Sequence, residues 1–429
     1  MKYFKDEFDT FLDSIKNENE SLVNLRKESF ENFINNGLPT KKWEDWQFTN
    51  FSNIENEEFR LSSPQDIIEI PDFLPGKIPN THSVFIINGL YRPNLSDLPN
   101  EVKISSCADH FKSHPNYYSH EEMKKNWTRG LNPFYALNTS MMNSGMSVQV
   151  DDGVILKKPL HIIYLTTSNV DKIMNHPRYV FHIGNHSEAT IIEHYIGSTT
   201  TSYFNNVVTK IQLNKNAFVN HIRIQEEASK SHHVANTFYK LEKESTLSVN
   251  NASFGSSLFR HNINLKFCGD NSNANYSALS LTEKKQHHDQ NIIVEHMTDS
   301  CQSDQLFKYI LADQSSGVFN GKVIVGEHTK RTNASQSNKN LVLSPSALMN
   351  ANPQLEIYAE DVKCSHGSTT GQIDPEALFY LKSRGLNHDK SMELIMNGFM
   401  SDVIELVKDK DTAEYLNKAA SLQLKKILT

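Results

Sequence analysis

The amino-acid sequence predicts a mainly β fold, in which a β-helix-like solenoid carries a small α-helical region at each end. Between residues 83 and 368 the apolar segments are short, β-branched and alternating, and Asn, Gly, Ser and Asp separate them. Similar segments recur within this stretch at a nearly constant interval. Both ends of the chain instead carry apolar residues at helical spacing.

The composition is that of a folded protein with a slight excess of acidic residues. The chain has 429 residues, of which 38% are hydrophobic and 22% are charged. This length suits two or three domains, or one long repetitive domain. Lys and Arg number 43 against 50 for Asp and Glu, so the net charge is −7. A non-specific nucleic-acid binder needs a basic face, and the charge balance argues against that class.

The cysteines and the apolar runs predict a cytoplasmic protein. Cys107, Cys268, Cys301 and Cys364 are too far apart for a CxxC pair or a dense disulfide framework, which favours reduced thiols. Acidic residues interrupt the N-terminal stretch where a secretory signal needs about 7–15 apolar residues. No run reaches the ~18 apolar residues of a membrane helix.

Residues 1–80 are predicted as an N-terminal helical region followed by a connector. The motif Pro39–Thr49 holds two of the three tryptophans, Trp43 and Trp46. We interpret this motif as an aromatic clamp that packs a loop on the domain, with a ligand platform as the alternative. Residues 55–80 are polar and rich in proline, as in a connector. The helical spacing before the motif is carried by Phe4, Phe8, Phe11, Leu12, Ile15, Leu22 and Leu25.

Residues 81–370 are predicted as the solenoid core. Small residues near the starts of one set of strands fall at positions 189, 217, 246 and 274, which gives steps of 28, 29 and 28. A steady period of this length indicates stacked coils, and the hairpins of a large sandwich are the alternative. A second set, with steps of 27, 29 and 29, consists of Val207, Val234, Ile263 and Ile292. The residues expected to face the core include Ile191, Val219, Leu247 and Tyr276.

Residues 371–429 are predicted as a C-terminal helical domain. Asp374 can cap a helix that begins with Pro375, and Gly385 can end it. A third helix is predicted over 413–428. Such a small helical unit has little core of its own, so it must dock on the solenoid, on a partner or on both. The second helix carries an apolar stripe made of Met392, Ile395, Phe399, Val403 and Leu406.

Most signatures of enzyme chemistry are missing. The segment Gly317–Val323 comes nearest to a phosphate-binding loop, but it is one residue too short and lacks the Ser or Thr that holds magnesium. We interpret it as a strand turn and expect no ATP on this chain. Two acidic pairs are typical of solvated turns, namely Asp151-Asp152 and Glu360-Asp361. Strand alternation predicts one inward and one outward ring in each of the pairs His232-His233 and His287-His288.

The segment around Cys364 and His366 is the one candidate for metal chemistry. In an extended chain, residues i and i+2 lie on the same face, so these two side chains project together. A thiolate and an imidazole suit iron or zinc. An iron-sulfur cluster usually takes four ligands, so a partner chain would have to supply the rest. A buried cysteine beside a hydrogen-bonded histidine is the alternative.

The sequence resembles, over essentially its whole length, the SufB/SufD family, the scaffold proteins of the SUF iron-sulfur cluster assembly system. The resemblance is carried by residues 353–385, PQLEIYAEDVKCSHGSTTGQIDPEALFYLKSRG, and the Pro39–Thr49 motif resembles that of the SufD branch. Cys364 to Gly371 stand where SufB-type chains have a different segment, which again favours the SufD branch. Further matches are Gly317, Phe319, Asn320, Gly321, Val323, Gln336, Asn340, Leu341, Leu343, Ser344 and Ala347.

This resemblance implies a right-handed parallel β-helix and a non-catalytic scaffold subunit. The implied partners are a SufB-like paralogue and SufC, an ABC-type ATPase that carries the ATPase activity, and an isolated chain can pair with a second copy. His366 matches the histidine that faces the partner's cysteine, so it is the candidate metal ligand shared with the partner chain, and Cys364 is its neighbour. The cluster would be a transient cargo shared with the paralogue, and the motifs leave any role of a flavin open. The implied SufC-docking region includes Phe379, Tyr380, Arg384 and Phe399.

Two other functions remain open at this point. One is a purely structural subunit that anchors SufC without holding iron. The other is a β-helix enzyme that acts on polysaccharide, which would need an exposed groove of acidic or basic residues and usually an export signal.

Overall fold

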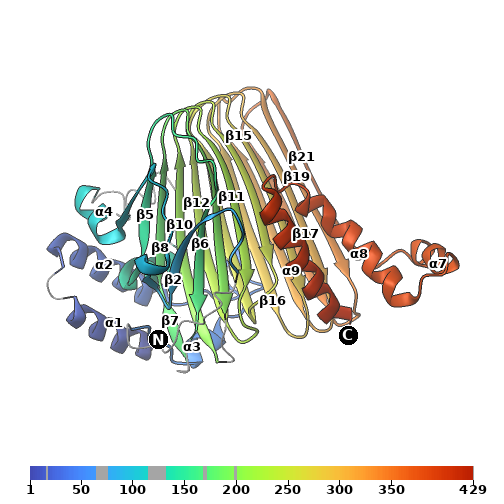
Figure 1. Ribbon diagram of the computed structural model, residues 1–429, viewed down its shortest axis with the longest axis horizontal. Coiled ribbons are helices and arrows are strands. Elements are labelled where there is room, and N and C mark those ends of the chain that lie inside the picture. The colour runs from blue at the N-terminus through green and yellow to red at the C-terminus, as the bar shows by residue number, and fades with distance from the viewer. Residues whose placement is uncertain (16–17, 64–75, 115–131, 168–171, 198–200, 429) are drawn as a thin grey trace.

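The computed structural model describes residues 1–15, 18–63, 76–114, 132–167, 172–197 and 201–428. Its centre is a parallel β-solenoid of about seven turns, with helices at both ends (Figure 1). Residues 64–75 of the predicted connector lie outside the described residues.

Each coil of the solenoid contributes one strand to each of two sheets. One sheet runs in the order β20-β18-β16-β14-β12-β10-β8-β5-β4, and the other in the order β21-β19-β17-β15-β13-β11-β9-β6-β2-β3. The early strands are β1 (Arg60–Leu61), β2 (His82–Ile87), β3 (Leu90–Tyr91), β4 (Val102–Ser106), β5 (Ser144–Val150), β6 (Leu160–Thr166) and β7 (Ile173–Asn175). The later even-numbered strands are β8 (Pro177–Ile183), β10 (Tyr203–Leu213), β12 (His232–Leu241), β14 (Leu258–Phe267), β16 (His287–His296), β18 (Ser316–Val325) and β20 (Leu348–Ile357). The later odd-numbered strands are β9 (Glu188–Gly197), β11 (Phe218–Glu226), β13 (Thr246–Ser253), β15 (Asn273–Thr282), β17 (Gln302–Leu311), β19 (Thr332–Val342) and β21 (Val362–Gly371).

Parallel pairing between alternate strands excludes the hairpin sandwich and confirms stacked coils. The register differs from the predicted repeat in both sets of residues, as one example from each set shows. Val219, rather than Ala217, pairs with Ala189. Ala235, rather than Val234, aligns with Val207. The turns vary in length, so equal sequence steps do not give equal register. The four residues expected to face the core, Ile191, Val219, Leu247 and Tyr276, all lie in the interior apolar cluster.

The turns that lead into the odd-numbered strands share one device. A residue with positive φ sits at each corner, and its backbone N–H donates to a carbonyl oxygen in the next coil's turn. The left-handed conformation turns the chain sharply, and the hydrogen bond ties adjacent coils together. These residues are His186, Asn216, Glu244, Asn271, Ser300 and Arg331.

The N-terminal helices pack against the even-numbered sheet. They are α1 (Lys2–Ser14), α2 (Glu20–Asn36), the 3-10 turn η1 (Glu44–Trp46), α3 (Ser52–Asn56), α4 (Cys107–Ser113) and α6 (Pro133–Met141). The last two interrupt a stretch predicted as strands alone, and the Asn132 side chain caps α6 by accepting from two backbone N–H groups. Trp46 is buried against Phe134, and the Arg260 guanidinium lies 4.2 Å from its ring centroid. The Pro39–Thr49 motif therefore holds the predicted aromatic clamp.

The C-terminal helices α7 (Pro375–Ser383), α8 (His388–Ile404) and α9 (Lys410–Leu428) follow β21. Asp374 caps α7 as predicted, by accepting from the backbone N–H of Glu376. Helices α8 and α9 lie across the odd-numbered sheet, whereas α7 projects away from the solenoid (Figure 1). The buried apolar side chains of α8 include Met396, Met400 and Val403. Of these three, only Val403 belongs to the predicted stripe. No helix among the described residues is long and apolar enough to cross a membrane.

The segment Gly317–Val323, interpreted above as a turn, lies inside strand β18. Its alternate residues face the interior, where Phe319 joins the apolar core. A strand leaves no loop of backbone N–H groups to surround a phosphate.

Candidate functional site

The solenoid ends at β20 and β21, and no element among the described residues caps this end. Each of these strands is the last of its sheet, and no described strand pairs with its outer edge. Solenoids usually end in a polar cap, because an open last coil exposes both core side chains and unpaired backbone groups. An uncapped end is therefore a candidate contact surface.

One half of the open end is polar and comes from β21. Strand β21 pairs in register with β19, whose alternate residues face the interior. Gln336 on β19 points across the interior toward Gly321 on β18. By strand alternation, the residues of β21 that continue these inward rows are Cys364, His366, Ser368 and Thr370, which stand above Ala334, Gln336, Asn338 and Asn340.

Side-chain hydrogen bonds join the last two coils at two of these four positions. The Ser368 hydroxyl donates to Asn338 Oδ1 at 2.9 Å. Asn340 Nδ2 donates to Thr370 Oγ1 at 3.0 Å, and the two asparagines also bond to each other. These bonds hold the inward side chains of β21 over the coil below.

The other half of the open end is apolar and comes from β20. Pro353 aligns with Gly321, and Leu355 aligns with Val323. Ile357 closes the row with 39% of its surface exposed. Together with Met349 and Ala351, these residues form an apolar strip that faces the polar row across the last coil.

Cys364 and His366 lie on one face of β21, where the sequence placed them. Burial raises the pKa of the Cys364 thiol, so the thiol is protonated at neutral pH in the isolated chain. His366 is exposed. Thiol sulfur and imidazole nitrogen suit iron, but they supply half of a four-ligand set. No group of three or more His, Cys, Asp or Glu among the described residues has the arrangement of a metal site.

A second exposed surface lies on α7. Phe379 is 73% exposed and Tyr380 is 55% exposed, and the Arg384 guanidinium lies 5.1 Å from the Tyr380 ring centroid. No residue of α7 is buried, so the helix contributes little to the core. Phe399 differs from these three, because it is partly buried and Lys308 Nζ lies 4.4 Å from its ring centroid.

The sequence matches two protein-family models that together span most of the chain. Residues 164–399 match the model "SUF system FeS cluster assembly, SufBD core domain", and residues 1–162 match "SufBD protein N-terminal region". The chain belongs to the SufB/SufD family. SufB/SufD proteins take part in iron-sulfur cluster assembly by the SUF system.

Several related proteins align with nearly the whole chain. A SufBD family iron-sulfur cluster assembly protein of Synechocystis is 32% identical over 408 residues, which are 91% of this chain and 88% of the relative. SufD of Escherichia coli is 30% identical over 390 residues, which are 90% and 89% of the two chains. The chloroplastic protein ABCI7 of Arabidopsis thaliana is 29% identical over 407 residues, which are 91% and 83%.

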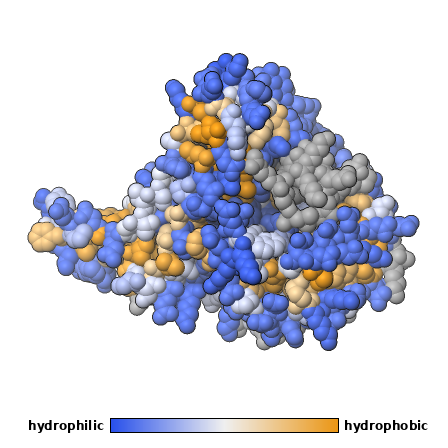
Figure 2. Space-filling view, turned by 180° about the vertical axis from the view of Figure 1, so that it is seen from behind, coloured by the Kyte–Doolittle hydropathy of each residue, from blue (hydrophilic) through white to orange (hydrophobic). Residues whose placement is uncertain are grey.

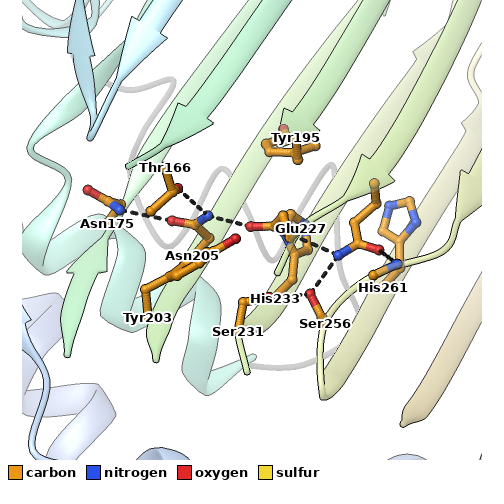
Figure 3. Close-up of polar contacts among 12 residues, drawn as sticks. Thr166, Asn175, Tyr195, Tyr203, Asn205, Glu227, Ser231, His233, Ser256 and His261 are labelled. Carbon is orange, nitrogen blue, oxygen red and sulfur yellow. Dashed lines mark hydrogen bonds and ion pairs between the residues drawn. The ribbon is translucent and has the colours of Figure 1, made fainter. Parts of the chain in front are cut away.

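The interior of this SufB/SufD solenoid also holds a buried polar network that the sequence reasoning missed (Figure 3). Asn205 Nδ2 donates to Glu227 Oε1 at 2.6 Å, and Gln225 Nε2 donates to Glu227 Oε2 at 3.0 Å. His233 Nδ1 lies 2.6 Å from Glu227 Oε2. Burial works to raise the pKa of Glu227, but the His233 charge and these hydrogen bonds lower it overall.

A second buried carboxylate, Glu193, lies close to this network, because its partner Tyr195 packs against the His233 ring. Glu193 accepts from Tyr195 at 2.5 Å and lies 3.3 Å from both Arg223 Nε and His221 Nε2. Burial works to raise the pKa of Glu193, but the bond from His221 and the charges of His221 and Arg223 lower it to about 2. Strand alternation placed Glu193 on the same face as Ile191, which was the available signal.

The two histidine pairs divide as predicted. His233 faces the interior network, whereas His232 faces outward and lies 3.1 Å from Glu57. His288 bonds to the Gly255 carbonyl in the interior, and His287 bonds outward to Thr49. The Asp151-Asp152 pair lies in an exposed turn, as expected.

A third group of titratable residues lies near the other end of the solenoid. His110 Nε2 and His182 Nε2 are 3.0 Å apart, and the His114 ring stacks on His110 with centroids 4.5 Å apart. Burial, followed by neighbouring positive charge, lowers the pKa of His110 to about 3 and that of His182 to about 4. Both rings are therefore neutral at physiological pH.

Proposed function

We propose that this chain is a SufD-like scaffold subunit that assembles iron-sulfur clusters at the open end of its solenoid. The observation that supports this most is the uncapped last coil, where Cys364 and His366 share one face. A SufB-like paralogue would cover this end, and a SufC-type ABC ATPase would drive the cycle. The chain itself acts as a scaffold rather than as an enzyme.

The donor set at the open end supports a site shared between two chains. Cys364 and His366 can supply two ligands, and a nascent cluster needs about four. A paralogue with its own open end would add further donors from the opposite side. A cargo held between two chains is released when the interface shifts, without unfolding either solenoid.

The C-terminal helices could transmit movement of the ATPase on ATP binding to this interface. The exposed Phe379 and Tyr380 of α7 form an apolar surface for the ATPase, with Arg384 beside them. Helix α8 is tied to the solenoid where Lys308 of β17 donates to the Phe399 carbonyl at 2.7 Å and pairs with Asp402. Strand β17 is separated from β21 by β19 alone. Movement of α7 and α8 on ATP binding would therefore act two strands away from His366.

A reconstitution experiment tests the role of His366. We expect His366→Ala to lower cluster formation at least ~10-fold in the anaerobically assembled complex, because one donor of the shared set is lost. Ser365→Ala is the matched control, since this neighbour faces the opposite side of β21. Iron and sulfide content and the visible absorbance of the complex provide the measurement. Normal assembly by His366→Ala in an intact complex would favour a subunit that only anchors the ATPase.

A further inference from the structure

The inward rows of the last two coils leave one polar position without its partner. Ser368 bonds to Asn338 and Thr370 bonds to Asn340, so two of the polar pairs between β21 and β19 are closed. The next pair in the same register is His366 above Gln336. His366 is exposed, and because parallel strands stack these side chains about 4.8 Å apart, a rotation of its ring would bring the imidazole to the amide below it.

The amide of Gln336 is fixed with its oxygen available. Gln336 is 3% exposed, and its Nε2 donates to Gln305 Oε1 at 3.0 Å. Donation to the coil below leaves Oε1 as the free acceptor, and this buried atom accepts no hydrogen bond from any described residue. A buried acceptor without a donor is unfavourable, so the position favours an N–H group from the coil above.

Gly321 makes room for this arrangement from the opposite sheet. A Cβ atom at position 321 would lie 2.3 Å from Gln336 Nε2 and 2.6 Å from Phe319 Cζ. Contacts this short would displace the amide. The stacking of Gln336 on Gln305 therefore depends on a glycine at position 321 of β18.

We propose that Gln336 is a positioning residue for His366. Its Oε1 accepts the N–H of one imidazole nitrogen, which selects a single tautomer. The other ring nitrogen then presents its lone pair at the mouth of the solenoid, where a metal ion can bind it. Gln305 acts one coil below by orienting the Gln336 amide. This inference rests on the proposed role of His366 as a ligand, but the proposed hydrogen bond involves residues of this chain alone.

The test uses selective isotope labelling of histidine in the isolated full-length chain. Nitrogen chemical shifts distinguish the two imidazole tautomers, and His366→Ala assigns the His366 signal. We expect one tautomer in the wild type and in Gln336→Glu, which keeps an acceptor. Gln336→Met removes the acceptor at similar volume and should give the mixed tautomers of a free imidazole. Gln354→Met, on the outer face of β20, is the control and should change nothing.

Cluster assembly by the reconstituted complex gives a second readout. We expect Gln336→Met to lower it about 10-fold, with recovery in Gln336→Glu and no change in Gln354→Met. An unchanged His366 tautomer in Gln336→Met would overturn the positioning inference, whatever the assembly rate. Normal assembly by His366→Ala would instead overturn the proposed function and leave the tautomer result standing. Thermal unfolding of each variant identifies any loss that comes from misfolding.

Discussion

Single residues in the interior carry charge where a solenoid usually carries apolar side chains. Glu193 is buried with Arg223 and His221, and its pKa is lowered to about 2. Removing one partner of a buried charge cluster leaves the other charges without compensation, which costs about 3–5 kcal/mol. The stability of the fold should therefore depend on these side chains and on the pH.

The pH dependence of stability tests the state of Glu193. A carboxyl group with a folded-state pKa of about 2 and an ordinary value of 4.5 contributes stability that is present above pH 4.5. That contribution is lost as the pH falls from 4.5 toward 2. We expect Glu193→Gln to unfold more easily at neutral pH and to lose less stability than the wild type over this acidic range. Denaturant unfolding at several pH values measures both effects.

The exposed Glu188 on the same strand provides the matched control. Glu188→Gln should follow the wild-type pH profile, because this side chain lies in solvent. Equal acid dependence in the wild type and Glu193→Gln would show that Glu193 is not an ionised partner of Arg223.

A methyl group at Gly321 should disturb the open end. We expect Gly321→Ala to lower the free energy of unfolding by about 1–3 kcal/mol, because the added Cβ would meet Gln336 and Phe319. Gly371→Ala, also near the last coil, has no atom within 4 Å of its new Cβ and should be tolerated. Thermal melting compares the two variants. Equal melting temperatures would contradict the packing described for the Gly321 position.

For single residues, the sequence predicted which face of a strand a side chain occupies better than it predicted what surrounds that side chain. Alternation placed Cys364 and His366 on one face, and it separated His232 from His233. The same rule, applied from Ile191, would have placed Glu193 inward, but a carboxylate in a strand is ordinarily expected in solvent. Its burial is possible only because Arg223 and His221 arrive from the next coil, and that pairing depends on three-dimensional register.

At the scale of elements, α7 is the helix least used by the fold. None of its residues is buried, and its aromatic side chains Phe379 and Tyr380 are exposed. Figure 2 shows the end of the molecule at α7 projecting from the solenoid, with apolar side chains on its surface. An exposed aromatic surface of this kind is typical of a protein-binding site.

Substitution of Phe379 tests this surface. We expect Phe379→Asp to weaken binding of the ABC-type ATPase by ~30-fold or more, as for a central aromatic contact. Stability should change little, because the side chain is 73% exposed. Leu422→Asp, at a 53% exposed position on α9, is the control. Calorimetric titration with the purified ATPase gives both affinities. Equal binding by wild type and Phe379→Asp would place the ATPase elsewhere.

The elements themselves followed from sequence more closely than their register did. The cap at Asp374, the three C-terminal helices and the strand-rich solenoid were predicted, although Gly317–Val323 was interpreted as a turn and lies inside β18. Helices α4 and α6 were not, because they lie between strands and are short. The predicted repeat misplaced several residues by one or two positions, Ala217 and Val234 among them, since turns of unequal length shift the register without changing the number of coils.

At the scale of the whole molecule, the two ends of the solenoid differ. The early coils are covered by α1, α2 and α6, whereas the last coil is left open between β20 and β21 (Figure 1). The open end presents an apolar strip on one side and Cys364 and His366 on the other. Under the proposed function, this asymmetry would let the scaffold work only when a second solenoid covers its end.

Affinity purification of the tagged full-length chain under anaerobic conditions tests this central claim most directly. The wild type should recover a SufB-like paralogue and an ABC-type ATPase in a fixed ratio. Ile357→Asp, at the open end, should lose the paralogue and keep the ATPase. Ile155→Asp, at a 62% exposed isoleucine in the early coils, should keep both. Recovery of the chain alone, or of the paralogue with Ile357→Asp at the wild-type level, would contradict the account.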